Sequence, residues 1–398
     1  MSNYLIIGNG VAGTTAVENI RKNDKEGNIT VVTDEDLPFY YRIRLNEYIC
    51  GDITEQDLLS KKEQWYMDKD IDLRLKTRIT GADPREKVII TEDNKRLFYD
   101  CLLIATGSHS FIPPIKGSEK KGVFSLRNIH DARDIIAHTE DIKEVVIIGG
   151  GLLGLESGNT FIKMGKKVTV VEFFPRLLPR QLDVDAAKIL QMIMEDMGFS
   201  FRLGAKTEEI EGDDLVHSVR LEGGETLPSK MVIISAGVRP NTDLAEHFDL
   251  ECDKGIKVDE RLLTNQSDIY AAGDVAEFKG IPYGIWPASM EQGKIAGINM
   301  AGGDMIYNGT TMANTLKVVG IDLASAGDID AENRHESIVY TEKDNYKKIV
   351  IEDNQIIGCI MLGDTNGFNK ITKAMTEKLD VSGIKDQILT ESFDFNRF

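Results

Sequence analysis

The stretch YLIIGNGVAG, residues 4–13, decides the fold of this chain, because an apolar run enters the glycine pattern Gly8-x-Gly10-x-x-Gly13. A helix-compatible segment follows, and then a second apolar run, NITVVT (28–33), with Asp34 and Glu35 at its end. A dinucleotide-binding β-turn-α-β unit requires this order of strand, glycine turn, helix and acid-terminated strand. The sequence therefore predicts a Rossmann-like nucleotide site near its start.

The same order returns 141 residues later. The run EVVIIG (144–149) enters Gly149-x-Gly151-x-x-Gly154, and a helix-compatible segment leads to KVTVVE (167–172), which ends in Glu172. LLIATGS (102–108) and VIISAGV (232–238) form a further matching pair of apolar runs that close on glycine. Similarity at a nearly constant offset indicates one unit used twice. We predict an α/β chain with two Rossmann-like domains and two nucleotide sites.

The acid after the second strand bears on the choice of nucleotide. A carboxylate at this position accepts hydrogen bonds from ribose hydroxyls, and it would repel a 2′-phosphate. Glu172 therefore favours NAD(H) over NADP(H) at the second site. Arg176, four residues further on, leaves the NADP(H) alternative open, because a nearby arginine can accommodate that phosphate.

Composition excludes several other classes of protein. The 398 residues carry a formal charge of −18, which disfavours nucleic acid and anionic membrane surfaces. No uncharged apolar run approaches the ~18 residues of a membrane span, and no basic residue precedes Arg21 as in a signal peptide. We therefore expect a cytoplasmic protein with no membrane segment. The six histidines lack ligand-like spacing, and no two cysteines form a CxxC pair, so no metal site is predicted.

The motifs GNGVAG, ATGS, GGGLLGLE, SAGVRPNTDLA and IYAAGDVAEF occur in an order that resembles the FAD-dependent pyridine nucleotide-disulfide oxidoreductase superfamily. PFYYRIRLNEYICGD (38–52) and WPASMEQGKIAGINMAG (286–302) are similar to NADH:rubredoxin oxidoreductases and to the flavin portion of assimilatory nitrite reductases. The resemblance implies an FAD domain (1–113 and 245–308) interrupted by an NAD(H) domain (114–244). A C-terminal α+β interface domain (309–398) follows, with strands at 346–352 and 355–362 joined by an Asp353-Asn354 turn.

The resemblance also assigns residues to each cofactor. FAD is expected to contact Gly8, Gly10, Val11, Ala12, Gly13, Asp34, Glu35, Arg42, Ile79, Ala105, Thr106, Gly107, Arg127, Gly273 and Asp274. NAD(H) is expected to contact Gly149, Gly151, Leu152, Leu153, Gly154, Glu156, Glu172, Gly237 and Val238. Asp274 would bind the ribityl chain, or else cap the next helix. Arg42 and Arg127 would neutralise phosphates, or else lie on the surface, and a helix beginning near Ser289 would point its positive end at the flavin.

Cysteine usage separates this chain from several relatives. It lacks the CxxxxC pair of disulfide reductases, and Ile43 stands where related oxidases and peroxidases have a single cysteine. Cys50, seven residues later, is either a displaced redox thiol or an inert packed cysteine. The charge expected beside the flavin differs as well. Ferredoxin reductases carry a lysine in this segment, and that lysine faces a glutamate that corresponds to Glu156. This chain has Glu47 in the segment instead. We hypothesise that Arg44 supplies the missing positive charge.

These features predict a reductase that passes hydride from NADH to FAD and then single electrons to rubredoxin or a similar iron–sulfur protein. No catalytic acid, base or nucleophile is assigned, and Arg44 and Glu156 are candidates for residues near the flavin and nicotinamide. The acidic chain would need a local basic patch for such a partner, with Lys370 and Lys373 or the Lys347-Lys348 pair as candidates. Three alternatives stay open: the FAD subunit of a larger iron–sulfur complex, a redox-sensing interaction protein, and an NADH oxidase. The chain is expected to be a monomer or a homodimer.

Overall fold

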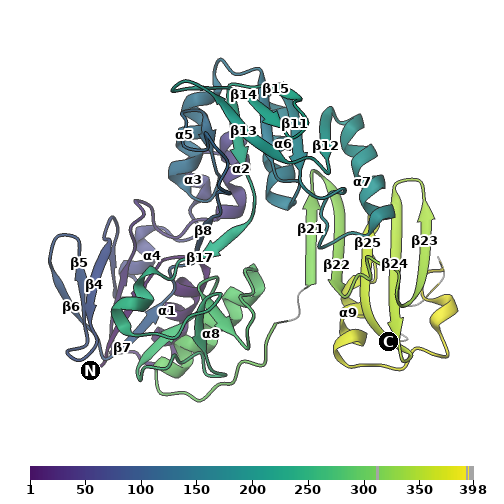
Figure 1. Ribbon diagram of the computed structural model, residues 1–398. Helices are drawn as coiled ribbons and strands as arrows, with labels where there is room; N and C mark the ends of the chain where they lie inside the picture. Colours follow the sequence, from purple (N-terminus) through teal and green to yellow (C-terminus); the bar gives the residue numbers. More distant parts are fainter. Residues whose placement is uncertain (311–312, 391–392, 394–398) are drawn as a thin grey trace. The chain divides into compact units, whose positions relative to one another are not determined.

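A computed structural model describes residues 1–310, 313–390 and 393, and these residues form two compact units (Figure 1). The first unit comprises Met1–Arg44, Ile53–His109 and Val238–Thr310, and the second comprises Leu45–Asp52, Ser110–Gly237 and Thr311–Phe398. The division into an FAD domain, an inserted NAD(H) domain and a C-terminal interface domain stays a prediction, because the packing distinguishes two units only.

The first unit is built on a parallel sheet of five strands. Their order is β19 (Ile269–Ala271), β7 (Cys101–Ile104), β1 (Asn3–Ile7), β2 (Asn28–Val32) and β3 (Ile71–Arg74). The apolar runs read from the sequence are the central strands, and Ile6, Val31 and Leu103 are fully buried in them. Burial of both faces of a parallel sheet explains why these strands are continuously apolar.

The helices α1 (Val11–Asn23) and α8 (Trp286–Met300) pack closely against each other (Figure 1). Added Cβ atoms at Gly293 and Gly297 would each lie 2.4 Å from a carbonyl oxygen of α1, at Ala12 and Ala16 respectively. The four-residue spacing on both helices places these small residues on facing stripes. Small residues thus bring α8 against the helix that follows the first glycine loop.

The remaining elements of the first unit are shorter. One group is an antiparallel sheet of β4 (Ile79–Asp83), β5 (Val88–Thr91) and β6 (Arg96–Phe98). Two strand pairs are β18 (Ile256–Val258) with β20 (Ala276–Phe278), and β8 (Ser108–Ser110) with β17 (Val238–Pro240). The short helices are α3 (Glu55–Leu58), α4 (Glu63–Met67) and the 3₁₀ helices η1 (Arg42–Arg44) and η2 (Asp243–Phe248).

The second unit repeats the plan of the first. Its parallel sheet has the order β12 (Phe199–Leu203), β11 (Lys167–Glu172), β10 (Glu144–Ile148), β16 (Met231–Ile234) and β9 (Val123–Phe124). The three-stranded sheet of β13 (Thr207–Gly212), β14 (Val216–Leu221) and β15 (Thr226–Pro228) occupies the same place in the chain order as β4–β6. The helices α6 (Leu152–Lys163) and α7 (Val184–Asp196) contact the parallel sheet, and α2 (Leu45–Ile49) contacts α5 (Ile129–Thr139) and α6. The predicted α/β fold with two Rossmann-like sheets is confirmed.

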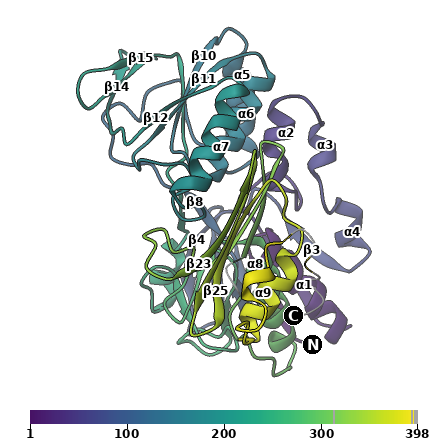
Figure 2. The ribbon, with the colours of Figure 1, turned by 90° about the vertical axis from the view of Figure 1, so that its right-hand side faces the viewer.

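The C-terminal part of the second unit is an antiparallel sheet with one helix on it (Figure 2). The strand order is β21 (Ala313–Val318), β22 (Ile321–Gly327), β25 (Gln355–Leu362), β24 (Asn345–Glu352) and β23 (Glu336–Glu342), followed by α9 (Phe368–Thr376) and η3 (Lys385–Gln387). The predicted hairpin is confirmed, since Asp353 and Asn354 have φ values of +48° and +61° between β24 and β25. Such a pair of positive φ angles fits the twist of a two-residue hairpin turn.

Candidate functional site

The first glycine loop is packed so that only its middle glycine faces open space. Gly8 has φ +107°, and a Cβ atom there would lie 2.1 Å from the Ala105 carbonyl oxygen. A Cβ atom at Gly13 would lie 2.1 Å from the Gly8 carbonyl oxygen, whereas one at Gly10 would meet nothing within 4 Å. The outer glycines therefore hold the strand, loop and helix together. The middle glycine leaves room for a ligand at the N-terminus of α1.

The second loop has the same geometry. Gly149 has φ +117° and lies against the Ser235 carbonyl oxygen, which would be 2.2 Å from an added Cβ atom. Gly154 lies against the Gly149 carbonyl oxygen at the same 2.2 Å, and Gly151 again faces open space. Leu152 and Leu153 begin α6 after this loop. Both loops can therefore accept a phosphate-bearing ligand at a helix N-terminus.

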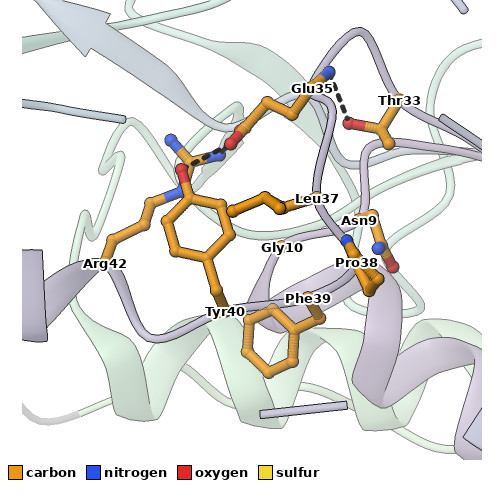
Figure 3. A pocket seen from close by; sticks show the side chains of 9 residues that line it. All are labelled: Asn9, Gly10, Thr33, Glu35, Leu37, Pro38, Phe39, Tyr40 and Arg42. Carbon is orange, nitrogen blue, oxygen red and sulfur yellow. Dashed lines mark hydrogen bonds and ion pairs between the residues drawn. The ribbon is translucent and has the colours of Figure 1, made fainter. Parts of the chain in front are cut away.

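A pocket opens beside the first loop, between Gly10 and the segment after β2 (Figure 3). Glu35 lies in it, and its carboxylate accepts hydrogen bonds from the Tyr40 hydroxyl and the Arg42 guanidinium. Asp34, the neighbouring acid, is not among the lining residues. The pocket thus combines an acid for ribose hydroxyls with a cation for phosphate oxygens.

Asn9 leaves an unused donor in this pocket. Its Oδ1 accepts hydrogen bonds from the Tyr66 hydroxyl at 3.0 Å and from Thr14 Oγ1 at 3.3 Å. Its Nδ2 is buried and has no hydrogen-bond partner among the described residues. Buried donors in native proteins are almost always satisfied, so a ligand acceptor at this point is expected. The residues present therefore fit a nucleotide.

Asp274 lies near the first loop, in the turn between β19 and β20. Ser108 donates a hydrogen bond from Oγ to Asp274 Oδ2 at 2.7 Å, and Ser289 Oγ lies 3.5 Å from Oδ1. Gly273, with φ +85°, is held by a hydrogen bond of 2.8 Å from its N–H to Gln292 Oε1, and an added Cβ atom would lie 3.0 Å from that of Ala12. The predicted residues are thus fixed beside α1 and the first turns of α8.

Three further predicted residues follow β7. Ala105 is buried against Gly8 as described, and the Thr106 hydroxyl and carbonyl form two hydrogen bonds with Asn241 at 2.9 and 2.8 Å. Gly107 has φ +70° and turns the chain into β8. Ile79 begins β4 and is partly buried against an apolar cluster around β7.

The acid of the second site has different partners from Glu35. Glu172 is 7% exposed, and its carboxylate accepts hydrogen bonds from the N–H groups of Gly150 at 2.5 Å and Phe174 at 2.8 Å. Arg176 donates to the carbonyl oxygens of Leu182 and Pro179 at 3.2 and 3.1 Å. Its guanidinium therefore binds the backbone of this loop. Donors used in this way are less available to a 2′-phosphate, which weakens the NADP(H) alternative.

Glu156 lies on α6 and is partly buried, and burial raises the pKa of its carboxyl to about 7. Glu47 lies on α2, which packs against α6 in the second unit. Arg44 belongs to the first unit, where its guanidinium donates to the Asp57 carbonyl oxygen at 3.0 Å. Neutralisation of Glu156 by Arg44 therefore stays a hypothesis. A proton kept by the Glu156 carboxyl near neutral pH is a second way to prevent two negative charges, those of Glu47 and Glu156, from facing each other.

Of the other predicted residues, Arg127 and Gly237 lie in the second unit, and Val238 begins the last segment of the first unit. Arg127 immediately precedes Asn128, the N-cap of α5, and its backbone N–H donates to Asp131. Gly237, with φ +99°, and Val238 follow β16, at the end of the strand next to β10. Their assignment to a cofactor, like that of every residue above, stays a prediction.

Cys50 is partly buried, and its thiol donates a weak hydrogen bond to the Glu47 carbonyl oxygen at 3.4 Å. Burial, with the nearby Asp52 carboxylate, raises the pKa of this thiol. A raised pKa lowers the thiolate fraction and hence the reactivity of a cysteine. This environment favours the inert interpretation of Cys50.

One predicted basic patch is wrong. Lys348 is 1% exposed and pairs with Asp183 at 3.3 Å, so it cannot serve as a docking surface. The side chain of Lys347 is 13% exposed and pairs with Asp364 at 2.6 Å. Lys370 and Lys373 on α9 are exposed, although Lys373 lies 3.6 Å from Glu377. Within the described ranges, no helix is long and apolar enough to span a bilayer, and no cluster of three acidic, cysteine or histidine side chains could hold a metal.

Sequence reasoning missed several residues around the first loop: Asn9, Tyr40, Tyr66, Ser108 and Gln292. Asn9 stands inside the glycine motif and Tyr40 close to Glu35, so proximity in the sequence could have indicated both. Tyr66 reaches Asn9 and Gln292 reaches Gly273 from distant helices, and no local pattern indicates them.

The fold and the two glycine loops define a dinucleotide-binding flavoprotein of the oxidoreductase class. The chain belongs to the pyridine nucleotide-disulphide oxidoreductase family, whose model matches residues 2–301, and residues 313–379 match the rubredoxin NAD+ reductase C-terminal domain. FAD and NAD(H) are the cofactors of this family. The predicted family and cofactors are confirmed.

Named relatives and solved structures agree with this assignment. Nitrite reductase [NAD(P)H] of Bacillus subtilis is 36% identical over 95% of this chain but only 48% of its own length. NADH-rubredoxin oxidoreductase of Clostridium acetobutylicum is 32% identical over 93% of both chains. The crystal structure of NADH:rubredoxin oxidoreductase from that organism has a TM-score of 0.84 and 30% identity, covering 96% of this chain and 97% of the other. The chain thus spans about half the length of the nitrite reductases that it matches.

Proposed function

We propose that this chain is an NADH-dependent flavoprotein reductase in which the first glycine loop holds FAD and the second holds NADH. The observation that carries the proposal is the repeated loop geometry, since Gly10 and Gly151 are the two motif glycines that face open space. Each loop lies at the N-terminus of a helix, where free N–H groups and the helix dipole attract phosphate oxygens.

The residues of the first site act by binding and orientation. Asn9 Nδ2, which lacks a partner among the described residues, and the Arg42 guanidinium would donate to phosphate oxygens, and Glu35 would accept from the adenosine ribose. Asp274, oriented by Ser108, would accept from the hydroxyls of the ribityl chain. Gly273 lets the turn that carries Asp274 lie close to α1, since an added Cβ atom there would lie 3.0 Å from the Cβ atom of Ala12.

In the second site, Glu172 would accept from the adenosine ribose of NADH. A bound FAD would supply an acceptor for the hydride of NADH that can release the two electrons one at a time. The protein contributes position, because the two rings need only lie in contact for hydride transfer. Glu156, a carboxyl that changes charge near neutral pH, would hold or release a proton at its Oε atoms beside the second loop.

We further infer that the electrons leave to rubredoxin or a similar small iron–sulfur protein. The CxxxxC pair of disulfide reductases is missing from the sequence, and Cys50 has a raised thiol pKa, so the chain lacks an activated thiol to carry electrons onward. The match of residues 313–379 to the rubredoxin NAD+ reductase C-terminal domain supports this choice. Lys370 and Lys373 are the candidate docking cations, since charge complementarity mainly speeds association.

The test uses the FAD-loaded protein without oxygen. We expect NADH to bleach the flavin and NADPH to do so much more slowly. Reduced protein should then be mixed with rubredoxin, a ferredoxin, oxygen and peroxide in separate experiments, and rubredoxin should discharge it fastest. Fast discharge to peroxide would favour the oxidase alternative, and slow discharge to every acceptor would favour a redox sensor.

A second candidate is the FAD subunit of a larger iron–sulfur oxidoreductase. It is favoured by two nitrite reductases and an assimilatory nitrate reductase electron transfer subunit, in which a region like this chain makes up about half of a longer protein. Copurification of an iron–sulfur protein with the chain from its native source, together with rubredoxin discharge no faster than ferredoxin discharge, would favour this candidate.

A further inference from the structure

The loop between β11 and α7 is held firmly to the second glycine loop. The N–H of Leu178 donates to the Gly150 carbonyl oxygen at 3.2 Å, and an added Cβ atom at Gly150 would lie 3.0 Å from Leu177 Cδ2. Leu177, Leu178 and Leu182 are all fully buried. Leu178 has φ +47°, a conformation that leucine keeps only where its surroundings hold it.

Asp183 ends this loop and has two roles. Its Oδ1 accepts from the Ala186 N–H at 3.0 Å and so caps α7. Its Oδ2 accepts from the Tyr346 hydroxyl at 2.6 Å and lies 3.3 Å from Lys348 Nζ. Asp183 therefore joins the end of the nucleotide loop to the strand β24.

The lysine in this contact is a buried cation. Lys348 is 1% exposed, and besides Asp183 it donates to the Asp330 carbonyl oxygen at 3.0 Å and to Asn333 Oδ1 at 3.2 Å. Tyr346 is 1% exposed as well. A buried charge of this kind is strongly unfavourable once its partner is removed, so the three side chains depend on one another.

The alternation of side chains along β24 explains how Tyr346 and Lys348 can contact Asp183 while the opposite face of the strand packs with α9. Tyr346 and Lys348 are two residues apart and point to one face of the sheet, whereas Ile349 and Ile351 point to the other. The isoleucines pack with α9 in an apolar cluster. The face that carries Tyr346 and Lys348 therefore lies away from α9 and meets the start of α7.

From this geometry we propose that Asp183, Tyr346 and Lys348 are positioning residues, through which the C-terminal sheet holds the nucleotide loop in its NADH-binding conformation. The proposal rests on the proposed NADH role of the second loop. The line of contact runs from Lys348 through Asp183 and the buried leucines to Gly150. Loosening it should weaken NADH binding without changing a residue that touches the nucleotide.

The experiment uses the full-length, FAD-loaded protein with Lys348→Met, Asp183→Asn, Tyr346→Phe and the Asp183→Asn/Lys348→Met double variant. Asparagine caps helices as well as aspartate does, so Asp183→Asn removes the charge and keeps the cap. Lys347→Met is the matched control, because that lysine lies on the same strand but pairs with Asp364. Stopped-flow bleaching of the flavin against NADH concentration gives an apparent Kd and a limiting rate for each variant.

We expect Lys348→Met and Asp183→Asn each to raise the apparent Kd for NADH about tenfold, with limiting rates within about twofold of wild type. The double variant should be less impaired than the two single effects combined, because neither charge is then left unpaired. Tyr346→Phe, the mildest change, should raise the Kd by a smaller factor, and Lys347→Met should leave it unchanged.

Three other outcomes are informative. Lower melting temperatures with an unchanged Kd, measured well below every unfolding transition, would show a structural role only and overturn the proposal. Equal weakening in Lys347→Met would overturn it too. If wild-type protein shows no saturation with NADH at all, the proposed function of the second loop is itself wrong. If Lys348→Met or Asp183→Asn fails to fold, the apparent Kd values of Tyr346→Phe and of the double variant still decide the question.

Discussion

The N–H of Gly150 donates a hydrogen bond of 2.5 Å to the carboxylate of Glu172, so the acid at the end of β11 closes against the middle of the second glycine loop. The corresponding acid of the first site, Glu35, is held instead by the side chains of Tyr40 and Arg42. Two sites with the same loop geometry thus orient their acids differently. Backbone donors hold Glu172 whatever side chains its neighbours carry.

Glu172→Gln should weaken the use of NADH and narrow its preference over NADPH. The amide nitrogen of glutamine would face one of the two backbone N–H donors, and the charge that repels a 2′-phosphate would be lost. We expect kcat/KM for NADH to fall about tenfold, equal to about 1.4 kcal/mol, while that for NADPH stays constant or rises. Glu222→Gln, at an exposed acid of the same unit, is the control. An unchanged NADH/NADPH ratio in Glu172→Gln would exclude the assigned role.

Gly10→Ala and Gly151→Ala should separate the two nucleotide sites. Both glycines have ordinary φ values, −86° and −79°, and open space around an added methyl group, so neither change should lower stability by more than about 0.5 kcal/mol. If phosphates occupy that space, Gly10→Ala should be purified with little FAD. Gly151→Ala should keep its FAD but lose affinity for NADH about tenfold or more.

Absorbance of the flavin and stopped-flow bleaching measure the two outcomes, and Gly383→Ala, another glycine with open space, is the control. Gly13→Ala should behave differently and unfold the chain, because its Cβ atom would lie 2.1 Å from a backbone oxygen. Normal cofactor binding in both Gly10→Ala and Gly151→Ala would contradict the proposed sites.

Glu156 predicts a specific dependence of stability on pH. Burial raises the pKa of its carboxyl from 4.5 to about 7, so between these values the folded chain keeps a proton that the unfolded chain has lost. The contribution of this group to the free energy of unfolding is therefore largest below pH 4.5 and falls as pH rises to about 7. Glu156→Gln removes the ionisable group, and the variant should gain about 1–3 kcal/mol relative to wild type between pH 5 and pH 8.

Urea unfolding of the FAD-loaded protein at pH 5 and pH 8 measures this gain, with Glu222→Gln as the matched control. A parallel pH dependence in Glu156→Gln and wild type would show that Glu156 ionises normally, as it would if Arg44 neutralised it. The experiment therefore also tests the hypothesis that Arg44 supplies a compensating charge.

Cys50 should take no part in turnover. Because burial and Asp52 raise the pKa of its thiol, Cys50→Ser should change the rates of flavin reduction by NADH and of discharge to peroxide by less than about twofold. Iodoacetamide at pH 7.5 should label Cys50 more slowly than a free thiol, as mass spectrometry of peptides can show. Cys252→Ser, at an exposed cysteine, is the control. Loss of peroxide discharge in Cys50→Ser alone would support the oxidase alternative.

Local patterns predicted much of the fold. The strand KVTVVE is β11 to the residue, and the Asp353-Asn354 turn joins β24 to β25 as expected. These features depend on neighbouring residues, through apolar runs and the conformations that glycine, aspartate and asparagine tolerate. The prediction from local sequence that Lys348 belongs to an exposed basic patch was wrong. Alternation in a strand shows that two adjacent lysines point to opposite faces of the sheet, but it does not show which face is covered by other parts of the protein.

The sequence by itself determined the duplicated strand–glycine–helix–strand plan, because the turn, the helix start and the acid all lie within about 30 residues of each other. Only the tertiary structure decided which distant groups complete the sites. Tyr66 donates a hydrogen bond to Asn9, Ser108 donates one to Asp274, and Lys348 forms an ion pair with Asp183. Such pairs join residues that lie 57, 166 and 165 positions apart in the chain. Their approach depends on how whole helices and sheets pack, and no short-range periodicity records it.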